Sequence, residues 1–166
     1  GGDVETLLLE SPLYKTPSDW SADGRFVFYH SRDPQTDMDI WVLPLDGDRK
    51  PWLFLKTRFN ERHGNLSPDG RWVAYMSNES GRTEIYVRPF VARGPKGSGT
   101  GEDASTGQWQ ISSTGGIFPR WARDGRELYY VGPDARMMAV PIRATGATLD
   151  PGEPIPLFET RIAEGG

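Results

Sequence analysis

Cysteine is absent from the 166-residue chain. Its absence excludes disulfide bonds and thiolate metal sites, and it leaves the redox compartment open. No apolar run approaches the roughly 18 residues of a membrane-spanning helix, and no signal peptide is recognisable. We interpret the Gly-Gly pairs at both ends as marks of a segment excised from a longer protein. The compartment, cytoplasmic or extracytoplasmic, therefore stays undetermined.

A surplus of charge of one sign is also lacking. The formal net charge is −4, and basic and acidic residues are interleaved along the chain. There is no basic stripe of the kind that binds nucleic acid, and no amphipathic basic segment that would contact a membrane surface. Neither class of partner is expected for this segment.

Turn-forming and aromatic residues, by contrast, are abundant. The sequence contains 20 Gly, 14 Pro, 6 Trp, 6 Tyr and 7 Phe. Turn formers alternating with aromatic residues favour many short strands over helices. We therefore predict an all-β fold.

Three elements recur in the same order along the chain. The first holds an Asp-Gly-Arg triplet and reads WSADGRFVFY at 20–29, LSPDGRWVAY at 66–75 and WARDGRELYY at 121–130. The second contains a proline and reads DIWVLPL at 39–45, EIYVRPF at 84–90 and RMMAVPI at 136–142. The third reads PWLFLKT at 51–57, QWQISST at 108–114 and PIPLFET at 154–160. Asp-Gly between apolar runs predicts a tight hairpin with both residues at positive φ. Each unit is then a propeller blade of four antiparallel strands.

The repeat sets the predicted boundaries. Blade 1 covers 14–57, blade 2 covers 58–114 with a Gly/Ser-rich loop at 93–107, and blade 3 covers 115–162. The segment TLLLES at 6–11 resembles the closing strands, so we expect it to be the outer strand of a neighbouring blade.

These residues resemble the TolB-type, WD-related propeller repeat of bacteria, whose hallmark is a W-S-P-D-G-[RK]-x-[IL]-[AV]-[YF] stretch. LSPDGRWVAY matches it nearly completely. More narrowly, the segments SDWSADGRFVFYHSRDPQTDMDIWVLPLDGDRKP, RWARDGRELYYVGPDARMMAVPI and PLFETRI are similar to the C-terminal propeller of acidobacterial serine/threonine kinases. That resemblance implies a sensory or interaction region of a larger bacterial signalling protein.

Three blades do not close a ring, because propellers usually have 4–8. The chain is therefore half, or another fragment, of a roughly six-bladed propeller. We expect two copies to close the ring as a homodimer. An open monomer is the alternative.

No catalytic constellation is recognisable. The sequence lacks a G-x-S-x-G elbow and a G-x-x-x-x-G-K-[ST] loop, so we predict no enzyme activity and no cofactor. His30 and His63 fall at different points of their repeats, and we predict no zinc site. Asp33, Asp37 and Asp39 favour a solvated acidic loop over a calcium site, because the Gly and Glu of an EF-hand are missing.

The predicted binding residues lie at the channel mouth formed by the innermost strands. Asp19, Asn65 and Arg120 precede the equivalent positions 20, 66 and 121, and they differ between blades while the framework stays constant. His63 precedes the innermost strand of blade 2, where a solvated loop position is the simpler interpretation. We expect a protein or small-molecule partner at this mouth, whose identity the sequence does not give.

Two functional classes remain. The first is a non-catalytic module for protein–protein interaction, scaffolding or ligand sensing. The second is the accessory, substrate-gating propeller of a prolyl-oligopeptidase-like or tricorn-like hydrolase, whose catalytic serine would lie elsewhere in the parent chain.

Overall fold

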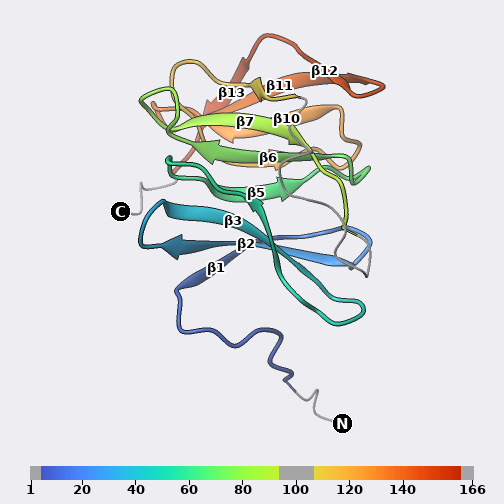
Figure 1. Ribbon diagram of the computed structural model, residues 1–166. Helices are drawn as coiled ribbons and strands as arrows, with labels where there is room; N and C mark the ends of the chain where they lie inside the picture. Colours follow the sequence, from blue (N-terminus) through green and yellow to red (C-terminus); the bar gives the residue numbers. More distant parts are fainter. Residues whose placement is uncertain (1–4, 94–106, 162–166) are drawn as a thin grey trace.

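The computed structural model describes residues 5–93 and 107–161, and three antiparallel sheets follow one another through it (Figure 1). The first sheet has the order β1 (Lys15–Trp20), β2 (Phe26–Asp33), β3 (Asp37–Pro44), β4 (Trp52–Leu55). The second has the order β5 (Arg62–Leu66), β6 (Trp72–Ser77), β7 (Glu84–Pro89), β8 (Trp109–Gln110). The described residues contain no helix, and so none that could span a membrane. The all-β propeller architecture is confirmed.

The third sheet contains one strand more than expected. Its order is β12 (Thr148–Pro151), β11 (Arg136–Thr145), β10 (Glu127–Val131), β9 (Ile117–Trp121), and β13 (Ile155–Glu159) also pairs with β11. The ten-residue β11 is long enough to use its first half for β13 and its second half for β12. The fifth strand thus comes from a hairpin that closes at Gly146, which has a φ of 59°.

The Asp-Gly-Arg turns differ from the predicted geometry. Gly24, Gly70 and Gly125 have φ values of 74°, 69° and 70°, but their preceding aspartates are not at positive φ. In the first turn, Gly24 N donates to Ser21 O at 2.8 Å and Ser21 N donates to Phe26 O at 2.9 Å. Only the glycine is left-handed, because the aspartate carboxylate accepts from the amide two residues later and so holds the turn without a positive φ of its own.

Two hydrophobic cores lie between neighbouring sheets. Phe28, Ile40 and Val42 of the first sheet pack against Val73 and Tyr75 of the second. The opposite face of the second sheet packs against the third through a cluster that includes Trp72, Met76, Ile85, Leu128, Tyr130 and Val140. The second sheet is therefore covered on both faces, as blade stacking requires.

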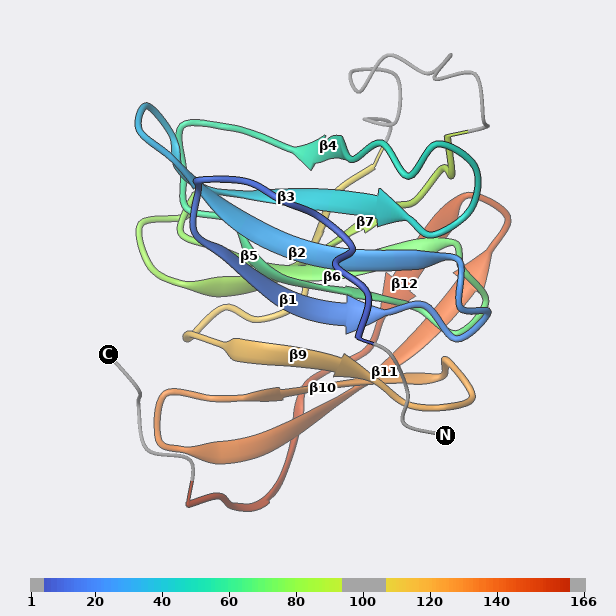
Figure 2. The same ribbon diagram turned by 90° about the horizontal axis from the view of Figure 1, so that it is seen from below.

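The first strands of the sheets lie next to one another, β1 beside β5 and β5 beside β9 (Figure 2). They are the innermost strands of the three blades. The side chains that could face a channel are consequently those of β1, β5 and β9.

Residues 6–11 form no strand in the single chain, and Leu7 is 73% exposed. The described residues contain no further sheet with which this segment could pair, so its role as an outer strand stays a prediction. The predicted loop at 93–107 lies, apart from its two end residues, outside the described residues. The strands of the three sheets fall within 14–57, 58–114 and 115–162.

Candidate functional site

The predicted mouth residues Asp19 and Asn65 connect neighbouring sheets. Asp19 Oδ2 accepts a hydrogen bond from Leu66 N at 2.7 Å, and Asn65 Oδ1 accepts one from Trp121 N at 3.0 Å. The two contacts are equivalent: a side-chain oxygen of one inner strand binds the amide that follows the corresponding position in the next. Asp19 and Asn65 differ in charge but share this acceptor.

Arg120 occupies the third equivalent position and breaks the pattern. An arginine side chain has donors only and cannot accept from the inner strand of a following blade. It is exposed, and its guanidinium donates to Pro119 O at 3.1 Å. The side-chain acceptors that link each inner strand to the next are therefore found in the first two sheets and not at the equivalent position of the third.

His63 is a strand residue rather than the loop residue predicted. It lies half-buried in β5 with a φ of 54°, and Phe118 has a φ of 57° at the equivalent position of β9. The His63 ring centroid lies 4.9 Å from that of His30 and 4.9 Å from that of Phe118. The fold thus brings together two histidines from different sheets, which the differing repeat positions had argued against.

Burial and nearby arginines favour the neutral form of both histidines. Burial, followed by the charge of Arg62, lowers the pKa of His30. Burial, the neighbouring His30 and the charges of Arg62 and Arg120 lower the pKa of His63 to about 4. Asp19 lies within the field of Arg120, although burial still raises the pKa of its carboxyl above the usual value. Arg62 and Arg120 therefore place positive charge beside His63.

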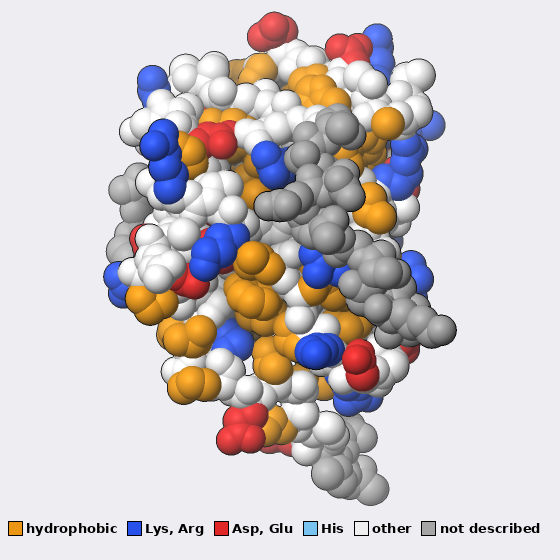
Figure 3. Space-filling model, viewed as in Figure 1, with side chains coloured by type: hydrophobic (Ala, Val, Ile, Leu, Met, Phe, Trp, Pro, Cys, Tyr) orange, Lys and Arg blue, Asp and Glu red, His pale blue; other side chains and the backbone are white. Residues whose placement is uncertain are grey.

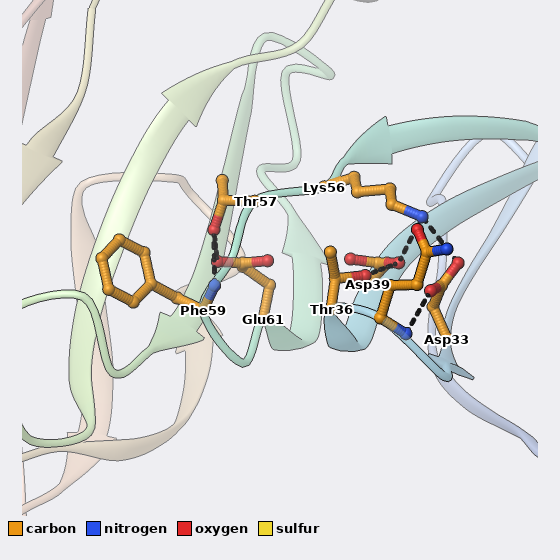
Figure 4. A network of polar contacts seen from close by, with 8 residues as sticks. Asp33, Thr36, Asp39, Lys56, Thr57, Phe59 and Glu61 are labelled. Carbon is orange, nitrogen blue, oxygen red and sulfur yellow. Dashed lines mark hydrogen bonds and ion pairs between the residues drawn. The ribbon is translucent and has the colours of Figure 1, made fainter.

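A second polar cluster surrounds the predicted acidic loop at one end of the first sheet (Figure 4). Lys56 Nζ lies 2.6 Å from Asp33 Oδ2 and 3.8 Å from Asp39 Oδ2. Thr36 donates to Asp39 at 2.9 Å. Lys56 thus pairs with two of the three aspartates, which leaves fewer carboxylate oxygens for a calcium ion. Among the described residues no group of three or more acidic or histidine side chains is arranged to hold a metal.

Glu61 lies at the boundary between the first and second sheets. Its side chain is 1% exposed, and Oε1 accepts from Thr57 Oγ1 at 2.5 Å. Its main-chain N donates to Met38 O of β3 at 2.8 Å. Burial, then the nearby charges of Asp39 and Glu79, raise the pKa of Glu61 to about 7.

Glu84 is the repeat counterpart of Asp39, at the boundary between the second and third sheets. Glu84 begins β7, and Asp39 lies near the start of β3. The Glu84 carboxylate accepts hydrogen bonds from Ser112 Oγ and, at 2.9 Å, from Gly115 N. The shared repeat position of Asp39 and Glu84, an acidic residue just before Ile-aromatic-Val, is a signal by which the sequence could have revealed these buried carboxylates.

A groove of about 590 Å³ lies at the outer rim between the first two sheets. Its apolar floor includes Phe26 and Trp52, and hydrophobic side chains gather over the first sheet in Figure 3. Basic Lys50 and Arg93 alternate with acidic Asp46 around it. This mixture of charges selects no ligand class.

Comparisons with known proteins agree with the propeller architecture. TolB from Agrobacterium tumefaciens matches with a TM-score of 0.62 at 20% identity, covering 91% of this chain and 52% of the TolB chain. TolB from Acinetobacter baumannii matches with a TM-score of 0.56 at 15% identity, covering 93% and 46%. At these identities the likeness shows the fold, and it confirms a TolB-like propeller fragment.

One curated relative is similar in sequence. The chain is 40% identical over 72 residues to Tricorn protease homolog 1 of Streptomyces coelicolor. That match covers 43% of this chain but only 6% of the relative, whereas the chain spans about half the length of the TolB structures. No protein-family model matches the chain. The narrower similarity to kinase-associated propellers stays a prediction.

Proposed function

We propose that the chain is a non-catalytic propeller module that binds a partner at its inner strands and reaches a closed ring by pairing with a second copy. The supporting observation is that a single chain leaves one blade position uncovered. Trp121 and Leu66 pack against the cores of their sheet boundaries, but Trp20 at the equivalent position is 62% exposed.

The face of the first sheet that carries Trp20 has the character of a blade interface. Tyr29 stacks on Trp41 with ring centroids 6.4 Å apart, just as Tyr75 stacks on Tyr86 at 5.9 Å at the covered position of the second sheet. Tyr29 is already buried in the single chain, but Trp20 on the same face is not. A preceding blade supplied by a second copy would cover this face.

Light scattering over a range of protein concentrations tests the assembly. A mass near twice 18.5 kDa at high concentration supports it. The Trp20→Asp variant should shift the equilibrium to monomer, because it places a charge at the centre of the proposed interface. Val91→Asp is the matched control, since Val91 is 66% exposed but lies after β7, away from this face. A monomer at every concentration, or equal effects of the two variants, would contradict the proposal.

The match to the Streptomyces relative supports a second candidate, the accessory propeller of a tricorn-like or prolyl-oligopeptidase-like hydrolase. Sequencing the gene that encodes this segment distinguishes the candidates. A catalytic segment with a serine elbow in the same reading frame supports the hydrolase role. A protein kinase segment in that place would contradict it and support the signalling role.

A further inference from the structure

The inner strands carry two arginines, Arg62 and Arg120, whose guanidinium groups lie near the histidine pair. Arg62 begins β5 and Arg120 lies in β9, and neither forms an ion pair within the described ranges. By contrast, Arg25, Arg32 and Arg136 all pair with carboxylates. The charge of Arg62 acts on both His30 and His63, and that of Arg120 acts on His63 and on the Asp19 carboxyl.

Two buried polar atoms beside the histidine pair have no hydrogen-bond partner among the described residues. His30 is 5% exposed and its Nδ1 is unpartnered, and the partly buried Arg62 has an unpartnered Nε. An unsatisfied buried polar atom costs free energy unless another molecule supplies the missing bond. The pair formed by His30 and His63, with ring centroids 4.9 Å apart, lies beside these groups.

We propose that His30, His63, Arg62 and Arg120 form a binding site for a carboxylate group at the inner strands. The four side chains come from three different sheets, so the site exists only when the blades are stacked. The inference deepens the proposed binding role and rests on it, because it names the chemistry of the ligand at the inner face.

The chemistry of the cluster favours a carboxylate over other ligands. Two guanidinium groups repel a metal cation, whereas their planar donors match the two oxygens of a carboxylate. Asp19 lies close enough to Arg120 for their charges to interact, and its carboxylate opposes a dianion such as phosphate more strongly than a monoanion. Phe118, edge-on to His63, offers an apolar wall to the carbon atoms of the ligand.

Binding should be coupled to proton uptake. The charged and titratable groups around the histidine pair are Arg62, Arg120 and Asp19. An added anion favours the imidazolium form of His30 and His63, so the affinity should increase as the pH falls.

The test follows the side-chain nitrogen signals of His30 and His63 by NMR while carboxylates are added to the full chain. Acetate represents a free organic acid, and the blocked peptide acetyl-Gly-Glu-Gly-amide represents a protein side chain. The matched peptide with Gln in place of Glu is the control. Both histidines should shift with either carboxylate and not with the Gln peptide. A response to acetate alone would assign the site to small acids, and a response to the Glu peptide alone would assign it to a protein partner.

The variants Arg62→Gln and Arg120→Gln should each weaken binding about tenfold or more, because each removes charge-assisted hydrogen bonds. Arg120 is exposed, so its variant keeps the test valid if Arg62→Gln fails to fold. Arg126→Gln, an exposed arginine of the third turn, should bind as the parent does. Absence of histidine shifts, equal binding of the Gln peptide, or undiminished binding by Arg120→Gln would overturn the inference. Light scattering on the same samples reports assembly separately, so failure of the site and failure of ring closure are distinguishable.

Discussion

Replacing Glu61 with glutamine should change how the stability of the fold depends on pH. The carboxylate is 1% exposed at the boundary between the first two sheets, and its Oε2 accepts no hydrogen bond from residues in 5–93 and 107–161. Oε1 accepts from Thr57, and Ser77 Oγ lies at 3.5 Å. Glutamine retains the acceptor for Thr57 and the volume of the side chain but cannot become charged.

The magnitude follows from the pKa, which burial raises from 4.5 to about 7. A carboxyl whose folded-state pKa lies above its unfolded-state value gives its full stability below the unfolded value. That stability is lost as the pH rises through the folded-state pKa. For Glu61 the loss falls between about pH 4.5 and 7 and amounts to about 3 kcal/mol. The Glu61→Gln variant should therefore gain roughly 2–3 kcal/mol relative to the parent between about pH 5 and 8.

Urea unfolding followed by tryptophan fluorescence measures this difference, since the chain has six Trp. At each pH the quantity to compare is the difference in the free energy of unfolding between the Glu61→Gln variant and the parent. The lowered pKa of His63 destabilises both of them as the pH falls from 6.5 toward about 4, and this contribution cancels. Glu153→Gln, an exposed substitution of the same chemistry, is the control and should follow the parent. The same pH dependence in Glu61→Gln and the parent would refute the assignment.

Three further substitutions test the blade contacts by urea unfolding. Asn65→Ala should cost about 1–3 kcal/mol because it leaves the buried Trp121 amide unpaired, whereas Asn65→Asp keeps the acceptor and should cost clearly less; equal losses would contradict this. Ala122→Ser should stabilise by about 0.5–1 kcal/mol, because the serines at this position of the first two turns accept from a strand amide, at 2.9 and 3.0 Å; no gain would contradict the equivalence of the turns. Lys56→Met should destabilise by about 1 kcal/mol by leaving Asp39 without its cation, and a double-mutant cycle with Asp39→Asn should recover that loss if the pair is its cause.

The repeated turns show what sequence reasoning captures well. Asp23, Asp69 and Asp124 accept from the amide two residues later at 3.0, 3.1 and 3.0 Å. This interaction needs only residues adjacent in the chain, so its spacing is visible in the sequence. The exact turn type was nevertheless mispredicted, because the aspartate bond removes the need for positive φ at that position.

The inner strands show the opposite case. Asp19 and Asn65 differ in sequence, and this variation suggested a role in recognition. In the fold both place a side-chain oxygen on an amide of the next sheet. Whether they also contact a partner stays a prediction. A difference in residue type can therefore conceal a shared hydrogen bond, and only the neighbouring strand reveals it.

The sequence alone determined the all-β class, the three blades and the positions of the turns, because strand alternation and turn chemistry act over a few residues. The tertiary structure decided which polar groups are buried and which lie together. His30 and His63 are 33 residues apart in the chain but adjacent in space, and Glu61 acquires its raised pKa from sheets on both sides. Such pairings depend on how the sheets stack, and burial in that stack sets the electrostatic cost of each charge.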